Sequence, residues 1–127
     1  MSNPQISSLI PIYTSRGDAE AFLVYPYLFN RTGDWIGFAT PKKEIYSVMG
    51  YYVGTLTNEP RIVRKRATST LKPRMRPPAQ PQKVYPPATV PLAPMMGDLS
   101  ISMVDVLLDE PERLHTVDSG EQRQDMD

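Results

Sequence analysis

The sequence predicts an all-β fold: a small pseudo-symmetric barrel built from repeated β-hairpins, followed by a proline-rich, largely disordered C-terminal arm with a short terminal helix. Three observations predict it. A motif recurs with starts at residues 12, 28 and 45, a glycine marks the same place in each copy, and prolines then crowd into one stretch. Each copy reads as an aliphatic-aromatic pair, three turn-prone residues, a glycine and a second apolar-aromatic run, which is the pattern of a β-hairpin. Equivalent hairpins in series are typical of a repeat-built sheet.

The turn glycines are Gly17, Gly33 and Gly50. They stand where a hairpin turn needs positive φ, which glycine adopts at little cost. In the second and third copies another glycine, Gly37 or Gly54, lies inside the returning strand. A glycine there predicts a bulge, a sharp bend or a close backbone approach, as small barrels need.

Aromatic residues recur at equivalent places in the hairpins. They are Tyr13, Phe29, Trp35, Tyr46 and Tyr52. Such residues could line a ligand channel, but recurrence favours core packing, because structural roles repeat whereas a binding site usually breaks symmetry.

A fourth copy begins at Ile62 and reads as a single strand, with Ala67 in the place of the turn glycine. Its returning strand is missing. This leaves an open edge, or a gap filled by residues 5–10 or by another subunit. We assign residues 1–67 to the barrel, and because a domain of this size is marginal alone, we expect homo-oligomerisation to be one remedy.

The remainder of the chain divides into a proline-rich basic linker (residues 68–97) and an acidic tail (residues 98–127). Eight of the 14 prolines fall between residues 73 and 94, which predicts a semi-rigid, exposed, polyproline II arm. Residues 99–110 predict a short amphipathic helix capped by Ser102. One face of it carries the candidate partner-binding residues Met103, Val104, Leu107 and Leu108. This segment either binds the groove of an unknown protein partner or folds back onto its own barrel.

The net charge of zero conceals a basic middle and an acidic end. The candidate anion-binding residues are Arg61, Arg64, Lys65, Arg66, Arg74 and Arg76. They could face an anionic membrane surface, or they could form a solvated edge strand. Attraction to the acidic tail in cis weakens the first reading, and no helix-turn-helix, zinc or RNA-recognition signature is present, so nucleic-acid binding is not expected.

The composition argues against several classes of protein. There is no cysteine, the one histidine, His115, lies in the polar tail, and the acidic residues lack metal-like spacing. We therefore predict no catalytic residue, no metal, no cofactor and no enzymatic activity. No apolar stretch approaches the roughly 18 residues of a membrane span, so no transmembrane segment and a cytoplasmic location are expected.

The repeated units Thr32-Gly33-Asp34-Trp35-Ile36-Gly37 and Met49-Gly50-Tyr51-Tyr52-Val53-Gly54 resemble those of the four-fold beta-flower family. The order of hairpins, basic strand, proline-rich arm and short acidic-apolar segment is also similar, over most of residues 12–110. The resemblance implies a shallow, pseudo-symmetric β-barrel with petal-like hairpins and an apolar central channel, but no established function. A loose similarity of that fold to tubby-like, membrane-associated barrels makes lipid contact one function to test. Ala21 and Ala67 depart from the pattern.

Two hypotheses of function follow. The leading one is a non-enzymatic binding or scaffold module that presents the proline-rich arm and a terminal recognition segment. Its alternative is an apolar ligand carrier or anionic membrane-surface binder that uses the barrel channel and the basic stretch from Arg61 to Arg76.

Overall fold

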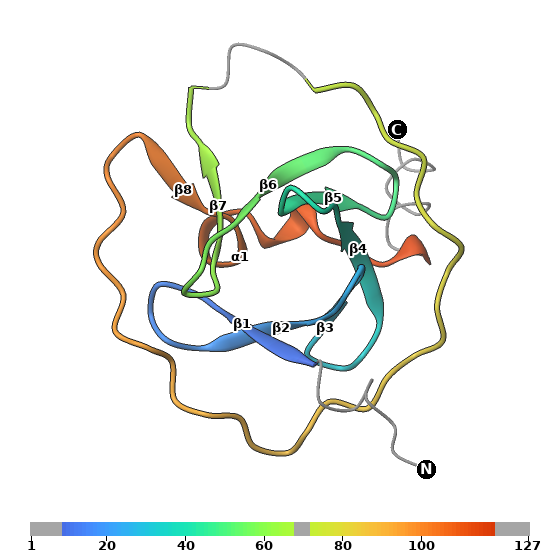
Figure 1. The fold of residues 1–127 in the computed structure, drawn as a ribbon, viewed down its shortest axis with the longest axis horizontal. Helices are drawn as coiled ribbons and strands as arrows, with labels where there is room; N and C mark the ends of the chain where they lie inside the picture. The colour runs from blue at the N-terminus through green and yellow to red at the C-terminus, as the bar shows by residue number, and fades with distance from the viewer. Residues whose placement is uncertain (1–8, 68–71, 119–127) are drawn as a thin grey trace.

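Eight antiparallel strands follow one another along the chain in a single sheet that curls into a half-barrel (Figure 1). The structure is a computed structural model, and it describes residues 9–67 and 72–118. The strands are β1 (Ile10–Tyr13), β2 (Ala19–Val24), β3 (Tyr27–Asn30), β4 (Trp35–Ala39), β5 (Glu44–Ser47), β6 (Tyr52–Leu56), β7 (Ile62–Lys65) and β8 (Met103–Asp105). A short helix α1 (Val106–Asp109) and a 3-10 turn η2 (Pro111–Arg113) follow. The predicted all-β, hairpin-built fold class is confirmed.

The first three hairpins, β1–β2, β3–β4 and β5–β6, are built alike. Their turn glycines all have positive φ, close to 90°. The strand register also shifts at the same place in each, between the aliphatic and the aromatic residue of the repeat, as at Ile12/Tyr13 and Leu28/Phe29. A bulge that recurs at an equivalent position bends each hairpin by the same device, which is how a small sheet curls.

The fourth hairpin is complete, so the prediction of a missing returning strand is wrong. β8 pairs with β7, with Val63 opposite Asp105 and Lys65 opposite Met103. The partner strand therefore comes from much later in the same chain, rather than from another subunit or from residues 5–10, of which 5–8 lie outside the described residues. The barrel boundary at residue 67 is wrong for the same reason.

The long connection from β7 to β8 surrounds the sheet, and we call residues 72–102 the strap (Figure 1). In its described part the strap contains no helix or strand, as expected for polyproline II. It is, however, anchored rather than free. Met75 N donates to Gly50 O (2.9 Å), Val84 N donates to Gly33 O (3.1 Å), and Tyr13 Oη donates to Pro91 O (2.7 Å). The predicted disorder beyond residue 118 lies outside the described residues.

The terminal segment differs from the predicted helix over residues 99–110. Its first part forms β8, and only Val106–Asp109 is helical. The N-cap is Asp105, whose Oδ1 accepts from Leu108 N (3.3 Å), rather than Ser102. Pairing with β7 takes precedence over local helix propensity here because β7 would otherwise present an open edge.

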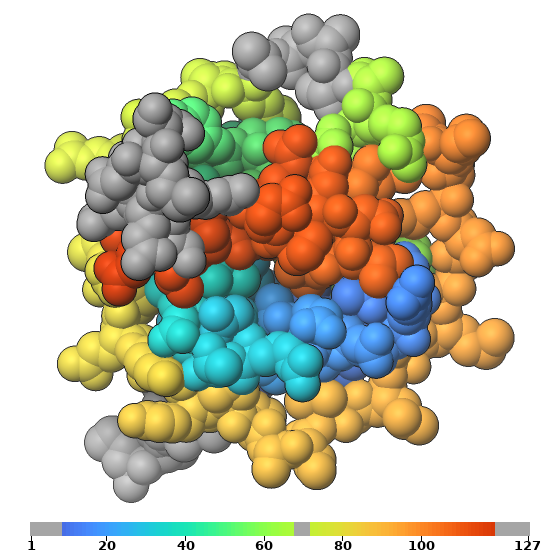
Figure 2. Space-filling model, turned by 180° about the vertical axis from the view of Figure 1, so that it is seen from behind, coloured from blue at the N-terminus to red at the C-terminus, as the bar shows by residue number. Residues whose placement is uncertain are grey.

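The central core is aliphatic and is completed by residues 103–114, which we call the C-terminal segment. It comprises Ile12, Ala21, Leu23, Leu28, Ile36, Ala39, Ile45, Val53, Ile62, Val106, Leu107 and Leu114. Figure 2 shows the C-terminal segment, orange to red, lying across the face between the hairpins. Val106, Leu107 and Leu114 of this segment therefore fill the space where the family resemblance implies an apolar channel.

The recurring aromatic residues do not line that channel. Phe29 and Trp35 form a second cluster together with Val84 of the strap. Tyr13 bonds the strap at Pro91, and Lys72 of the strap lies 5.2 Å from the centre of the Tyr52 ring. Tyr46 is buried and packs edge-on against Tyr52, with ring centres 5.7 Å apart. Four of the five aromatic residues therefore contact the strap, through Val84, Pro91 O or Lys72.

Candidate functional site

A pocket of about 530 Å³ opens where the three connectors between hairpins meet, and we call it the connector pocket. Its described lining includes Leu23, Ala39 and Leu56, which hold equivalent places at the ends of β2, β4 and β6. Ile10 and Tyr25 also line it and are 42% and 55% exposed. A mostly apolar concavity of this volume falls within the range of small-molecule sites.

Backbone hydrogen bonds fix the connectors beside this pocket to the hairpins. Pro26 O accepts from Ala39 N (2.7 Å), Lys43 O accepts from Leu56 N (2.8 Å), and Pro60 O accepts from Tyr13 N (3.0 Å). Each proline lacks an N–H and limits strand pairing, so the chain turns away from the ladder at these points. The repeated proline punctuation therefore gives the pocket a backbone-bonded rim.

The polar side of the pocket is formed by Lys43, Asn58, Thr40 and Thr57. Lys43 Nζ donates to Asn58 Oδ1 (2.7 Å). Its backbone φ is 65°, and among the described residues it is the one non-glycine position with positive φ. Within that part of the chain, no carboxylate lies at ion-pair distance from Lys42 or Lys43.

A second cavity, of about 550 Å³, lies between the strap and the first two hairpins. Its described lining contains Asp18, Glu20 and Arg31 together with Pro86 and Pro87. Glu20 and Arg31 approach each other at 3.9 Å in a partly exposed ion pair. Such a pair is worth little in water, and because its charges offset each other, Asp18 leaves the described lining with one net negative charge.

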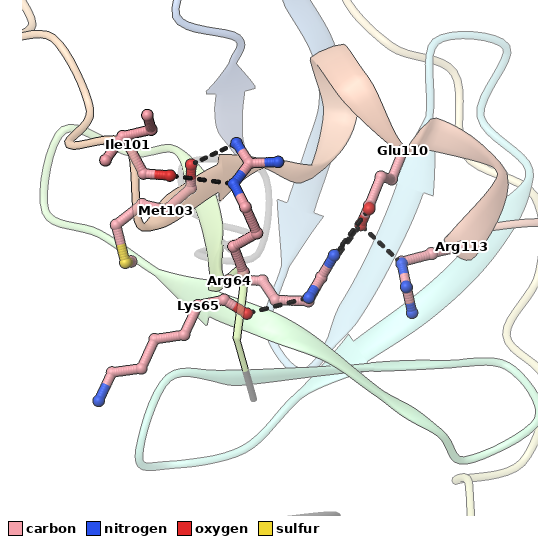
Figure 3. A network of polar contacts seen from close by, with 7 residues as sticks. Arg64, Lys65, Ile101, Met103, Glu110 and Arg113 are labelled. Carbon is pink, nitrogen blue, oxygen red and sulfur yellow. Dashed lines mark hydrogen bonds and ion pairs between the residues drawn. The ribbon is translucent and has the colours of Figure 1, made fainter. Parts of the chain in front are cut away.

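Most of the predicted anion-binding residues already donate within the chain. Arg61 is buried and donates to Ser15 Oγ (2.9 Å), Gly97 O (3.2 Å) and Glu59 Oε1 (3.0 Å). Arg64 points toward Glu110 and donates to both of its carboxylate oxygens (Figure 3).

The remaining members of that set lie further along the chain. Arg66 donates to Ile101 O (2.9 Å), and Arg74 donates to Met49 O (2.7 Å) while lying over the Tyr51 ring. Lys65 and Arg76 are exposed. At least four of the six thus donate to neighbouring groups of their own chain, so the structure does not present the set as one free basic surface.

Three ionisable groups respond to these contacts. Hydrogen bonds from Arg64, opposed by burial and aided by Arg113, lower the pKa of Glu110. The carboxylate of Glu44, 2.9 Å away, raises the pKa of Lys72 by hydrogen bonding. Burial, followed by the charge of Glu44, raises the pKa of Tyr46. The pKa shifts of Lys72 and Glu110 arise where the strap and the C-terminal segment attach, that of Tyr46 arises within the sheet, and none lies in the connector pocket.

A buried polar junction joins the two ends of the sheet, and residue patterns did not reveal it. Asp105 is 3% exposed, and its Oδ2 accepts from both Ser15 N and Ser15 Oγ at 2.6 Å. Arg61 donates to the same hydroxyl, and its Nε is buried without a partner. Nothing in the sequence pattern linked Asp105 to Ser15 in the first hairpin, which lies 90 positions earlier in the chain.

The predicted partner-binding residues lie largely within the fold. Val104 and Leu107 are buried, and Met103 and Leu108 are half-buried. Leu107 belongs to the central core. Of the two alternatives left open by the sequence, this arrangement corresponds to the segment folding back onto its own barrel.

Within residues 9–67 and 72–118, no group of three or more histidine, cysteine or acidic side chains is placed to hold a metal ion. No helix in that part of the chain is long and apolar enough to cross a membrane. Comparison with known proteins finds no matching family model, no matching curated protein and no matching solved structure. Membership of the four-fold beta-flower family therefore stays a prediction.

Proposed function

We propose that this protein is a non-enzymatic binding module that takes an apolar small molecule into the connector pocket. One observation carries the proposal: three hairpins contribute equivalent apolar residues, Leu23, Ala39 and Leu56, to a single concavity of about 530 Å³. A ligand there would gain from removal of apolar surface from water, about 25 cal/mol for each Å² buried.

The geometry favours this pocket over the two other candidate surfaces. A partner protein could reach Val104 and Leu107 only after this segment left the core. An external anion would compete with Glu110 for Arg64 and with Glu59 for Arg61. The connector pocket, in contrast, has exposed apolar residues at its rim in the folded state.

The chemistry of the lining supports binding rather than catalysis. The described lining residues include no histidine and no carboxylate that could serve as a general base. His115 lies elsewhere, with Nδ1 3.0 Å from Thr116 O.

Titration with Nile red, a neutral apolar dye, tests the proposal. We expect the dye to bind with increased fluorescence, and Leu56→Trp to abolish this binding by filling the pocket. The matched control is Leu92→Trp on the strap, because Leu92 is 96% exposed. A cooperative urea unfolding transition in both variants is the check that they fold. Absence of dye binding, or equal binding by the two folded variants, would overturn the proposal.

A further inference from the structure

Lys43 occupies a turn that elsewhere in this protein requires glycine. In the turn 40–44, Thr40 N donates to Glu44 O and Lys43 N donates to Thr40 O, both at 2.9 Å. The turn that contains Gly33 has the same pattern, with Asn30 N bonded to Asp34 O and Gly33 N bonded to Asn30 O. Lys43 therefore holds the left-handed position of a glycine turn.

That position carries a cost in stability. A left-handed conformation costs an ordinary residue about 1–2 kcal/mol, and glycine avoids the cost. Residues held in such conformations cluster at functional sites. The lysine side chain lines the connector pocket beside Asn58.

The charge of Lys43 is also available, in contrast with the charges of Lys72 and Lys83. Lys72 pairs with Glu44 at 2.9 Å, and Lys83 pairs with Asp34 at 3.8 Å. Lys43 instead donates to a neutral amide oxygen, and in the described part of the chain neither it nor Lys42 has a carboxylate partner. A ligand that carries a negative charge would meet no repulsion from the described pocket lining, which contains no acid.

We infer that the ligand of the connector pocket is a free anionic amphiphile, a long-chain carboxylate. Its aliphatic chain lies against Leu23 and Leu56, and its carboxylate accepts from the ammonium group of Lys43 in place of Asn58 Oδ1. This inference rests on the proposed function and names the ligand class of the same pocket. The charge of Lys43 complements the head group, and the apolar wall complements the chain.

Displacement of Nile red by dodecanoate and by dodecanol, which share one chain length, tests the inference at concentrations below micelle formation. We expect dodecanoate to displace the dye at about fivefold lower concentration than dodecanol, as for one exposed ion pair. Added salt should reduce this preference. Lys43→Asn, in which asparagine tolerates the left-handed turn, should remove the preference and keep dodecanol binding. Arg76→Gln, which removes a charge on the strap, should leave the preference for dodecanoate unchanged.

The outcomes separate the inference from the proposed function. Equal displacement by acid and alcohol would overturn the ligand class and leave the apolar pocket in place. A preference that survives Lys43→Asn would overturn the role of Lys43. Binding to phosphatidylglycerol vesicles without binding of monomeric dodecanoate would overturn the free amphiphile in favour of a membrane surface. Failure of Nile red itself to bind would overturn the proposed function.

Discussion

A Cβ atom on Gly33 would lie 1.9 Å from the carbonyl oxygen of Val84, so the strap crosses this turn at a distance that only glycine permits. Gly50 has the same relationship to Met75 O, at 2.0 Å. At Gly17 the nearest atom of another segment is Ala93 Cβ, at 3.8 Å. Two of the three turn glycines therefore serve the strap as well as the turn.

Asparagine substitution separates these two roles, because asparagine tolerates positive φ but has a Cβ atom. We expect Gly33→Asn to lower the free energy of unfolding by about 2–4 kcal/mol, through strain and loss of the strap contact. Gly17→Asn is the matched control and should cost about 1 kcal/mol or less. Urea unfolding measures both, and equal losses would show that the strap does not approach Gly33 closely.

The strap contains a repeat of its own that matches the hairpins. Met75 and Val84 are nine positions apart, and each is followed after one residue by two prolines. Each of the two donates to the turn glycine of a different hairpin. Polyproline II advances about 3.1 Å per residue, so the spacing sets the reach between neighbouring hairpins.

Deleting Ala79 should therefore prevent Met75 and Val84 from reaching their two glycines together. We expect the amide hydrogen of Met75 or of Val84, or both, to lose its protection from exchange, measured by NMR. As a control, one alanine is inserted after Gly97, because Gly97 lies in open space and a Cβ atom added to it would meet nothing within 4 Å. This insertion should leave the amide hydrogens of Met75 and Val84 protected. Unchanged protection in the deletion variant would contradict a strap held in register.

The three early hairpins could be predicted from sequence because their information is local. Each turn needs a glycine, and each strand pair shows its apolar pattern within a few residues, as around Gly33 and Gly50. The fourth hairpin could not be predicted, because its two strands are joined by residues 66–102. No local pattern indicates that Met103–Asp105 pairs with β7, and the same three residues also fit the start of an amphipathic helix.

The candidate site was predictable only in part. The repeat makes Leu23, Ala39 and Leu56 equivalent, but whether they meet around a pocket depends on the curl of the sheet. The recurring aromatic residues were identified, but not the face they occupy. A bulge shifts the register beside Tyr13, Phe29 and Tyr46, so simple alternation does not fix which side each aromatic faces.

Asp105 should be among the most sensitive polar positions of the protein. It caps α1 through Leu108 N and joins β8 to the first hairpin through Ser15. We expect Asp105→Ala to lower the free energy of unfolding by about 2–4 kcal/mol, because a cap and buried hydrogen bonds are lost together. Ser15→Ala should cost less, and the double variant should show a coupling energy of at least about 0.5 kcal/mol.

Urea unfolding of the two single variants and the double variant measures these terms. Asp109→Asn, an exposed change in the same helix, is the control and should stay within about 0.5 kcal/mol of the parent. If Asp105→Ala lowered the free energy of unfolding no more than Asp109→Asn does, the junction between the ends of the sheet would be contradicted. It would also be contradicted if the losses of Asp105→Ala and Ser15→Ala simply added in the double variant.

Glu110 should make stability depend on acid pH. Its carboxylate accepts from Arg64 at 2.7 Å and from Arg113 at 2.7 Å, and these bonds lower its pKa in the folded state (Figure 3). A lowered folded-state pKa stabilises the fold above the unfolded value of about 4.3, and this contribution is lost as pH falls through the folded pKa.

The gap in unfolding free energy between the parent and Glu110→Gln should therefore be largest near neutral pH and shrink below about pH 4. Urea midpoints between pH 3 and pH 7 measure this gap. A Glu110→Gln gap that stays constant across the range would show that Arg64 holds the C-terminal segment without help from the charge of Glu110.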